Sequence, residues 1–504
     1  MLKKLFIAIV VIVVLLASVP AYMFATGAIG TSSLRMMLNV VTGMGGPATD
    51  SGLVEQRYRV PAGFQVELYA SNLPRARFLR FTPMGDLLVS RPHSGDITML
   101  LKDRDGDGRP DGTRVILEGL SRPLGMDFLE NWLYVAESNR VGRIAFDTAT
   151  GLPAGAYETV IDGLTDNGNH WSKTLRVGPD QKLYLAQGST CNVCEEEDPR
   201  RATLMRFNSD GSDPQIIATG LRNAVGFDWA PWNGDLYATD NGRDLLGDDF
   251  PPCELNLITG NSFYGWPYFN GANVPDPDMG KDPLAAQREP VPPAHAFRAH
   301  NAPLGIAFVD TTGWPAGFER SALVALHGSW NRSEPDGYKV VSLHWSDSGI
   351  EERDFLSGFN LDGDISGRPV DVAQGPDGAI YISDDYAGAI YRVSTGSGGS
   401  SSMKIATPAQ PDDAPPQWLA SADTAQLALE GANLYQQYDC ASCHEAGENP
   451  ALLDDLHLRM NHTAVIEALR APQSPMPVFP LTDQQHRALA VFLLQPKTSH
   501  KESR

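Results

Sequence analysis

The chain has 504 residues, 42% of them hydrophobic and 20% charged, so it is long enough for two or more domains. Its 48 glycines and 37 prolines favour a turn-rich β architecture. The net charge of −21 excludes nucleic acid as the expected partner, because phosphates need Lys and Arg to neutralise them.

The N-terminus resembles a targeting segment. Two lysines precede an apolar run from Leu5 to Ala17, and the small residues Ser18–Ala21 follow. This order is typical of a secretory signal peptide, although the apolar character continues to Ala25 and approaches the roughly 20 residues that span a bilayer. We therefore predict that residues 1–26 are either a cleaved signal peptide or a membrane anchor, and that the protein is periplasmic.

One pattern recurs between residues 52 and 396: a polar turn, then a short apolar and aromatic strand that ends in small residues. The copies are Gly85–Ser90, Asn131–Ala136, Gln181–Ala186, Gly234–Thr239, Gly378–Ser383 and a divergent Ser321–Leu326. A spacing of about fifty residues is the period of a propeller blade, and the alternation around each copy indicates strands. Six copies predict an all-β, six-bladed propeller over residues 52–396.

Within this span, Asp103, Asp105, Asp107 and Asp111 alternate with glycines. Hard oxygen ligands at this spacing suit Ca²⁺ in a structural role, although a solvated acidic hairpin is the alternative. Among the cysteines, Cys191 and Cys194 could close a small disulfide loop, and Cys253 is left as a buried free thiol.

Residues 397–422 are rich in Gly and Ser, then in Pro and Asp, and are predicted to be a flexible linker. The apolar spacing then becomes helical over Asp423–Tyr438, and Thr482–Gln485 is a capping box that opens a last helix. Residues 423–496 are therefore predicted to form a small all-α domain.

The Cys-x-x-Cys-His motif at Cys440, Cys443 and His444 predicts a c-type haem, with two thioether bonds and the histidine as proximal iron ligand. Half of a zinc site is the alternative, but no second cysteine pair follows. Met476, between two prolines, is the predicted sixth ligand, because Met/His ligation is usual in electron transfer. The other candidates are Met460, His457 and His462.

Three further segments of the predicted propeller gather Gly, polar and aromatic residues. The first is Asn169–Tyr184, in which His170 precedes a repeat strand; alone, such a histidine is more often a structural loop residue. The second holds Gly220-Leu-Arg-Asn223, Asp240-Asn-Gly-Arg243, Glu254-Leu-Asn256 and Phe263-Tyr-Gly-Trp-Pro267, and the third holds His300, Arg332 and Arg368.

In order and spacing, these segments resemble the PQQ-dependent soluble aldose dehydrogenases, the glucose and sorbosone dehydrogenase family, over Val54–Val393. That family has a six-bladed propeller and passes a hydride from a sugar to pyrroloquinoline quinone (PQQ). The resemblance implies that His170 is the general base for the sugar's anomeric hydroxyl. It implies PQQ contacts from Arg222, Asn223, Arg368, Arg332 and His300, and Ca²⁺ held by the backbone carbonyls of Gly242 and Arg243.

The chain departs from the family pattern at three positions. Arg243 stands where the family has proline, Val370 replaces a basic residue, and Ser189 replaces an aspartate that would orient the base. These departures point towards the sorbosone or pyranose branch of the family.

The resulting prediction is a PQQ- and Ca²⁺-dependent sugar or aldehyde dehydrogenase whose electrons pass to the fused haem and on to an external respiratory acceptor. A flexible linker suits this route, because it keeps the haem domain at a high effective concentration. The alternatives are a non-catalytic sugar- or protein-binding propeller with a haem relay, and a lactonase-type hydrolase. The hydrolase would need a carboxylate metal site in the propeller channel, which the sequence does not indicate.

Overall fold

The computed structural model describes residues 46, 49–395, 417–420, 423–438, 440–444, 453, 456, 462–470, 472, 476 and 479–495. The chain divides into two compact units, a propeller unit and a helical unit. The segment 1–26 lies outside the described residues, and within them no helix is long and apolar enough to cross a membrane. That finding corrects the prediction of a periplasmic protein exported or anchored by this segment.

The propeller unit contains six antiparallel sheets with four principal strands each. The first three comprise β2 (Leu79–Phe81), β3 (Leu87–Arg91), β4 (Asp96–Leu100) and β5 (Thr113–Leu117); β6 (Met126–Leu129), β7 (Trp132–Ala136), β8 (Val141–Asp147) and β9 (Leu152–Ile161); and β10 (Lys173–Val177), β11 (Leu183–Gln187), β12 (Thr203–Phe207) and β13 (Gln215–Thr219). The last three comprise β14 (Ala224–Trp229), β15 (Leu236–Asp240), β16 (Cys253–Ile258) and β20 (His295–Phe297); β21 (Pro303–Phe308), β22 (Ser321–Leu326), β23 (Lys339–Ser346) and β24 (Gly349–Leu356); and β27 (Pro369–Gln374), β28 (Ile380–Asp384), β29 (Ala389–Thr395) and β1 (Phe64–Ala70). The connections add α3 (Ser51–Arg57), η1 (Ala285–Gln287), β17 (Ser262–Phe263), β18 (Phe269–Asn270), β19 (Val274–Pro275), β25 (Asn360–Leu361) and β26 (Asp364–Ile365).

Every sequence repeat forms the second strand of one sheet. These strands are β3, β7, β11, β15, β22 and β28, and the divergent copy Ser321–Leu326 is β22. Strands β11, β15, β22 and β28 are buried at every position, because neighbouring sheets cover both of their faces, which explains their continuous apolar sequence. The predicted six-bladed, all-β propeller is confirmed.

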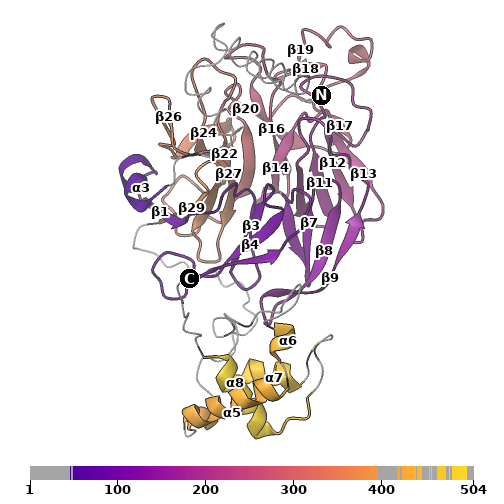
Figure 1. The fold of residues 1–504 in the computed structure, drawn as a ribbon. Helices are drawn as coiled ribbons and strands as arrows, with labels where there is room; N and C mark the ends of the chain where they lie inside the picture. The colour runs from indigo at the N-terminus through magenta and orange to yellow at the C-terminus, as the bar shows by residue number, and fades with distance from the viewer. Residues whose placement is uncertain are drawn as a thin grey trace, which may run out of the picture. The chain divides into compact units, whose positions relative to one another are not determined.

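The first strand closes the propeller by completing the last sheet. Strand β1 pairs antiparallel with β29, with Phe64 opposite Thr395, and Figure 1 shows the indigo strand beside the orange one. Around the centre, inner strands β14 and β21 approach so closely that a Cβ atom at Gly226 would lie 2.1 Å from the carbonyl oxygen of Leu304. Glycine is therefore required there, and the pairing of β1 with β29 joins the two ends of the propeller in one sheet.

The hairpin geometry of each blade defines one functional face. Strands β10 and β11 are antiparallel, so the residue that enters β10 and the residue that leaves β11 lie at the same edge. The same holds for the pairs β14–β15, β21–β22 and β27–β28. We call the edge formed by the loops before the inner strands and after the second strands the site face.

The helical unit is built from α4 (Gln417–Ala420), α5 (Thr424–Gln437), α6 (Ala441–His444), α7 (His462–Arg470) and α8 (Asp483–Leu493). Thr482 and Gln485 form the predicted capping box at the start of α8. Helices α5 and α8 meet at Gly431, where a Cβ atom would lie 2.2 Å from the carbonyl oxygen of Ala488. Leu434, Tyr435 and Leu489 are buried in the resulting core, as in the predicted small all-α domain. Within the predicted linker, only residues 417–420 are described.

Candidate active site

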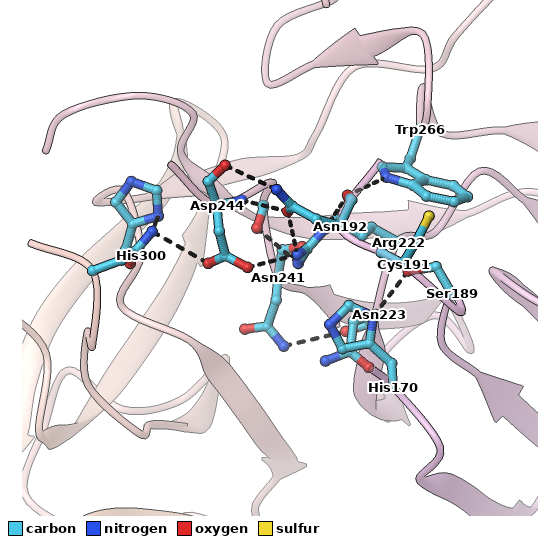
Figure 2. Close-up of polar contacts among 12 residues, drawn as sticks. His170, Ser189, Cys191, Asn192, Arg222, Asn223, Asn241, Asp244, Trp266 and His300 are labelled. Atoms are coloured by element: carbon cyan, nitrogen blue, oxygen red, sulfur yellow. Dashed lines mark hydrogen bonds and ion pairs between the residues drawn. The ribbon is translucent and has the colours of Figure 1, made fainter. Parts of the chain in front are cut away.

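The site residues predicted for the propeller, other than the aspartates of the 103–111 loop, lie in loops of the site face. His170 precedes β10, Arg222 and Asn223 precede β14, His300 precedes β21 and Arg368 precedes β27. Gly242 and Arg243 follow β15, and Arg332 follows β22. Figure 2 shows that polar contacts join several of these loops across neighbouring sheets.

His170 is held by the loop that follows β11. Its Nδ1 lies 2.8 Å from the Oγ atom of Ser189, and its backbone N–H donates to the carbonyl oxygen of Ser189 at 3.2 Å. Burial and the positive charges of Arg222 and Arg201 lower the pKa of His170 to about 3. The imidazole is therefore neutral at physiological pH and is able to accept a proton.

Arg201 is a structural residue that the sequence pattern did not single out. It is 2% exposed, and it donates to the carbonyl oxygens of Gly188, Thr165, Asn167, His170 and Ser189. All five N–H groups of the guanidinium are thus used by backbone acceptors. Arg201 fixes the loops on both sides of His170 and supplies one of the charges that lower its pKa.

Asn223 lies next to His170. A Cβ atom at Gly188 would be 2.5 Å from both the Oδ1 atom of Asn223 and the Cβ atom of His170, so glycine allows the two side chains to approach. The backbone N–H groups of Arg222 and Asn223 donate to the carboxylate of Asp240 at 2.9 and 2.6 Å. Burial raises the pKa of Asp240 to about 7.

The guanidinium of Arg222, 3% exposed, lies in a cradle of oxygen atoms. Nε donates to the carbonyl of Asn192 at 3.0 Å, and Nη1 donates to the carbonyls of Asn241 at 3.1 Å and Gly242 at 2.9 Å. Nη2 donates to Oδ1 of Asn192 at 2.8 Å and to Oδ2 of Asp244 at 2.7 Å. Sequence reasoning missed Asn192 and Asp244, which lie in loops of different sheets (Figure 2).

This cradle does not fit the calcium ion implied at Gly242 and Arg243. The Gly242 carbonyl already accepts a bond from the Arg222 cation, and the Arg243 side chain is tied to Asp276 and Asp278. A divalent ion sharing that carbonyl would lie about 4.5 Å from the guanidinium, and their repulsion would be on the order of 7 kcal/mol at an effective dielectric constant of about 20. Calcium binding there would require Arg222 to leave its five oxygen acceptors.

His300 and Arg332 hold a neighbouring loop. The Nε2 atom of His300 lies 2.7 Å from the carbonyl oxygen of Gly247, and its Nδ1 lies 3.3 Å from the amide nitrogen of Asn331. Arg332 donates to the carbonyl of Asp248 and to the carboxylate of Asp249. Both residues therefore anchor Gly247–Asp249 and are not placed as free partners for a carboxylate.

Arg368 belongs to a second polar cluster, in which the sequence motifs did not indicate Asp385 and Arg77. Its Nε donates to the carbonyl of His327 at 3.1 Å, and Nη2 donates to the carbonyl of Gly328 at 2.9 Å. Nε2 of His327 lies 2.9 Å from Oδ1 of Asp385, which also pairs with Arg77 at 2.7 Å. Burial and the charge of Arg368 lower the pKa of His327 to about 4.

The residues present fit an anionic quinone at the site face. PQQ carries three carboxylates, which bind best to guanidinium groups. The bonds to His327 and Gly328 use two of the five N–H groups of the half-buried Arg368, and the buried Arg222 supplies a second cation. Arg368 and the amide of Asn223 therefore offer hydrogen-bond donors to such a cofactor, whereas Arg222, whose five N–H groups all donate to protein oxygens, offers its positive charge.

The acidic loop brings three of its four aspartates together. Asp103, Asp105 and Asp111 offer oxygen atoms within 4.8 Å of one another, while Asp107 accepts the backbone N–H of Arg109 at 2.8 Å. The carboxylate of Asp103 also accepts the backbone N–H of Gly106 at 2.7 Å. This geometry agrees with a calcium loop and equally with a solvated acidic hairpin.

In the helical unit, Cys440 and Met476 pack against the same apolar cluster. The backbone N–H of His444 donates to the carbonyl of Cys440 at 3.0 Å, which continues the motif directly into α6. His462 lies at the start of α7 against Trp418. The side chain of Cys443 and the alternative ligands Met460 and His457 lie outside the described residues.

A six-bladed propeller with this loop chemistry, followed by a helical unit with Cys-x-x-Cys-His, defines a PQQ-dependent sugar dehydrogenase-like propeller with a C-terminal cytochrome c domain. By sequence, the chain belongs to the family described as a domain of unknown function (DUF7133), whose family model matches residues 55–396. A second family, cytochrome C oxidase, cbb3-type, subunit III, matches residues 426–493.

Three known proteins illustrate the similarity. The chain is 31% identical over 352 residues to an uncharacterized protein of Borreliella burgdorferi, covering 66% of this chain and 90% of that protein. It is 25% identical over 322 residues to a PQQ-dependent sugar dehydrogenase of Hypocrea jecorina, covering 53% and 72%. A solved structure of a Trichoderma reesei enzyme of Carbohydrate-Active Enzymes Family AA12 shares the fold, with a TM-score of 0.60, 20% identity and coverage of 67% and 98%.

Proposed function

We propose that the propeller oxidises an aldose, or a related sugar or aldehyde, by hydride transfer to PQQ. The electrons then pass to a c-type haem in the C-terminal unit and on to an external acceptor. The observation that carries the proposal is the neutral imidazole of His170, which Ser189 holds in place. The buried Arg222 cation lies close enough to lower the pKa of this imidazole. The similarity to a sugar dehydrogenase of Hypocrea jecorina supports the substrate class.

In this reaction, His170 accepts the proton of the substrate hydroxyl whose carbon loses the hydride. A protonated imidazole has no lone pair and cannot do this. The lowered pKa of His170 keeps the ring unprotonated at neutral pH. When bound, PQQ supplies an electrophilic carbonyl carbon that takes up the hydride.

Arg368 and Asn223 are the residues that we propose bind PQQ directly, and Arg222 contributes a fixed positive charge that favours an anionic ligand. His300 and Arg332 act on the cofactor only through the loop Gly247–Asp249, which they anchor. No step depends on calcium, because the guanidinium of Arg222 already occupies the carbonyl of Gly242. Asp103, Asp105, Asp107 and Asp111 remain a proposed structural calcium loop away from the chemistry.

For the haem, we propose thioether bonds from Cys440 and Cys443 and axial ligation by His444 and Met476. The packing of Cys440 and Met476 against one apolar cluster supports a common haem pocket. The linker 397–422 tethers this unit to the propeller, so electron transfer between the two units is an intramolecular event.

A PQQ titration of the full-length apo-protein, followed by assays of an aldose panel with an artificial dye as electron acceptor, tests the proposal. We expect saturable PQQ binding and dye reduction that requires both PQQ and sugar. Saturable sugar binding without any PQQ-dependent oxidation would support the non-catalytic propeller instead.

A further inference from the structure

The hydrogen bonds of one buried serine determine which nitrogen of His170 carries a proton. Ser189 is 0% exposed, and its Oγ atom has two close partners: Nδ1 of His170 at 2.8 Å and the carbonyl oxygen of Cys191 at 2.7 Å (Figure 2). A hydroxyl has one hydrogen to donate, and a carbonyl oxygen only accepts. The hydrogen of Ser189 therefore points to Cys191, and Nδ1 of His170 must donate to Oγ.

We propose that Ser189 is a positioning residue that fixes His170 in the Nδ1-protonated tautomer and so presents the Nε2 lone pair as the proton acceptor. This inference rests on the proposed function, because it gives the proposed base its orientation. Ser189 thus takes the place of a carboxylate, and the chain of contacts ends on a neutral backbone carbonyl.

The carbonyl at the end of this chain of contacts is held firmly. Cys191 forms a disulfide with Cys194, and the intervening Asn192 accepts three bonds from Arg222 and Trp266. The backbone N–H of Thr190 donates to the carboxylate of Glu196 at 2.6 Å. The disulfide-closed loop therefore holds His170 through Cys191 and Arg222 through Asn192.

Because the orienting group is neutral, the pKa of His170 stays low. The charged groups that act on the His170 ring are Arg222, from the loop before β14, and Arg201, from the loop before β12, and both are cations. A serine adds no negative charge to stabilise the imidazolium, whereas a carboxylate at position 189 would raise the pKa of His170. The active, neutral form of the base is lost only as the pH falls through its low pKa.

The direct test is the imidazole ¹⁵N NMR spectrum of the full-length apo-protein labelled with ¹⁵N-histidine. The signals of His170 are identified by their absence in His170→Gln. We expect a pyrrole-type Nδ1 and a pyridine-type Nε2 throughout pH 5–8, because Ser189 accepts from Nδ1. A pyridine-type Nδ1, or a titration near the ordinary pKa of about 6.5, would overturn the proposal.

Two substitutions give a second readout. Ser189→Ala removes the acceptor of Nδ1–H, so we expect mixed tautomers and a fall in kcat of about tenfold or more, part of the 10²–10⁴ that a positioned base contributes. Ser189→Asp should move the acid limb of the kcat profile towards neutral pH, and an unmoved limb in a folded variant contradicts the inference. Ser138→Ala is the matched control, because Ser138 is buried at the equivalent place after β7 and bonds Asp166 instead.

The NMR measurement uses neither PQQ nor sugar, so the two proposals fail separately. The expected tautomer in a protein that oxidises no sugar would refute the proposed function alone. The opposite tautomer in an active dehydrogenase would refute the role of Ser189 alone.

Discussion

Replacing His170 by alanine should reduce turnover far more than it reduces stability. The His170 side chain makes one hydrogen bond to a described residue, to Ser189, so its loss should cost about 1 kcal/mol of folding free energy. The loss of a positioned base should lower kcat by about 10²–10⁴, or about 3–5 kcal/mol of transition-state stabilisation. The difference between the two magnitudes separates a base from a packing residue.

The assay is sugar-driven reduction of the haem without oxygen, with PQQ at saturation. PQQ binding should stay nearly intact, because the proposed contacts come from Arg368 and Asn223, and the supporting charge comes from Arg222. Reduction of the haem by an artificial donor should not change, since it bypasses the propeller. His295→Gln is a matched control, because His295 lies on the outer strand β20 and pairs with Glu352 of β24, with Nε2 3.0 Å from Oε2.

The pH profile of the native enzyme sharpens the same prediction. The base works when it is deprotonated, so activity is lost as the pH falls through the pKa of His170, which lies at about 3. We therefore expect kcat to have no acid limb from His170 between pH 5 and 8. A limb near pH 6.5 that disappears in His170→Ala would contradict the low pKa of this base, and a His170→Ala variant with nearly native kcat would contradict its role as a base.

Arg222→Ala should weaken PQQ binding in a fluorescence titration and raise the pKa of His170, because a nearby cation is removed. Chelation by EDTA should leave PQQ binding unchanged, since Arg222 occupies the carbonyl of Gly242; loss of PQQ binding that calcium restores would contradict this. Cys440→Ala should weaken the attachment of haem to the denatured chain, measured by acid–acetone extraction. Met476→Ala should remove the far-red absorption of sulfur–iron ligation, and the same loss in Met460→Ala instead would reassign the ligand.

The fold was predictable because its signal is local. Each copy of the repeat, such as Gln181–Ala186, combines a turn with a buried strand, and the spacing of about fifty residues reports the blade directly. The divergent copy Ser321–Leu326 was still recognisable because strand β22 must be apolar on both faces. The helical unit was likewise indicated by a capping box and a haem motif, which are short sequence patterns.

The site was predictable only in part, because its contacts join loops far apart in the sequence. The family resemblance indicated His170 and Arg222, but nothing local to Asn192 or Asp244 shows that both accept from Arg222. The spacing of the motifs also does not specify where a long side chain, such as that of Arg222, points. The family resemblance therefore implied a calcium ion at Gly242, where the structure has a guanidinium.

The central claim is that sugar oxidation in the propeller reduces the haem of the same chain. Its most direct test is anaerobic rapid mixing of PQQ-loaded, full-length protein with an aldose while the haem absorbance is followed. We expect haem reduction that requires both PQQ and sugar and whose rate does not change when the protein is diluted. A haem that stays oxidised while an added dye is reduced by the same sugar would contradict it.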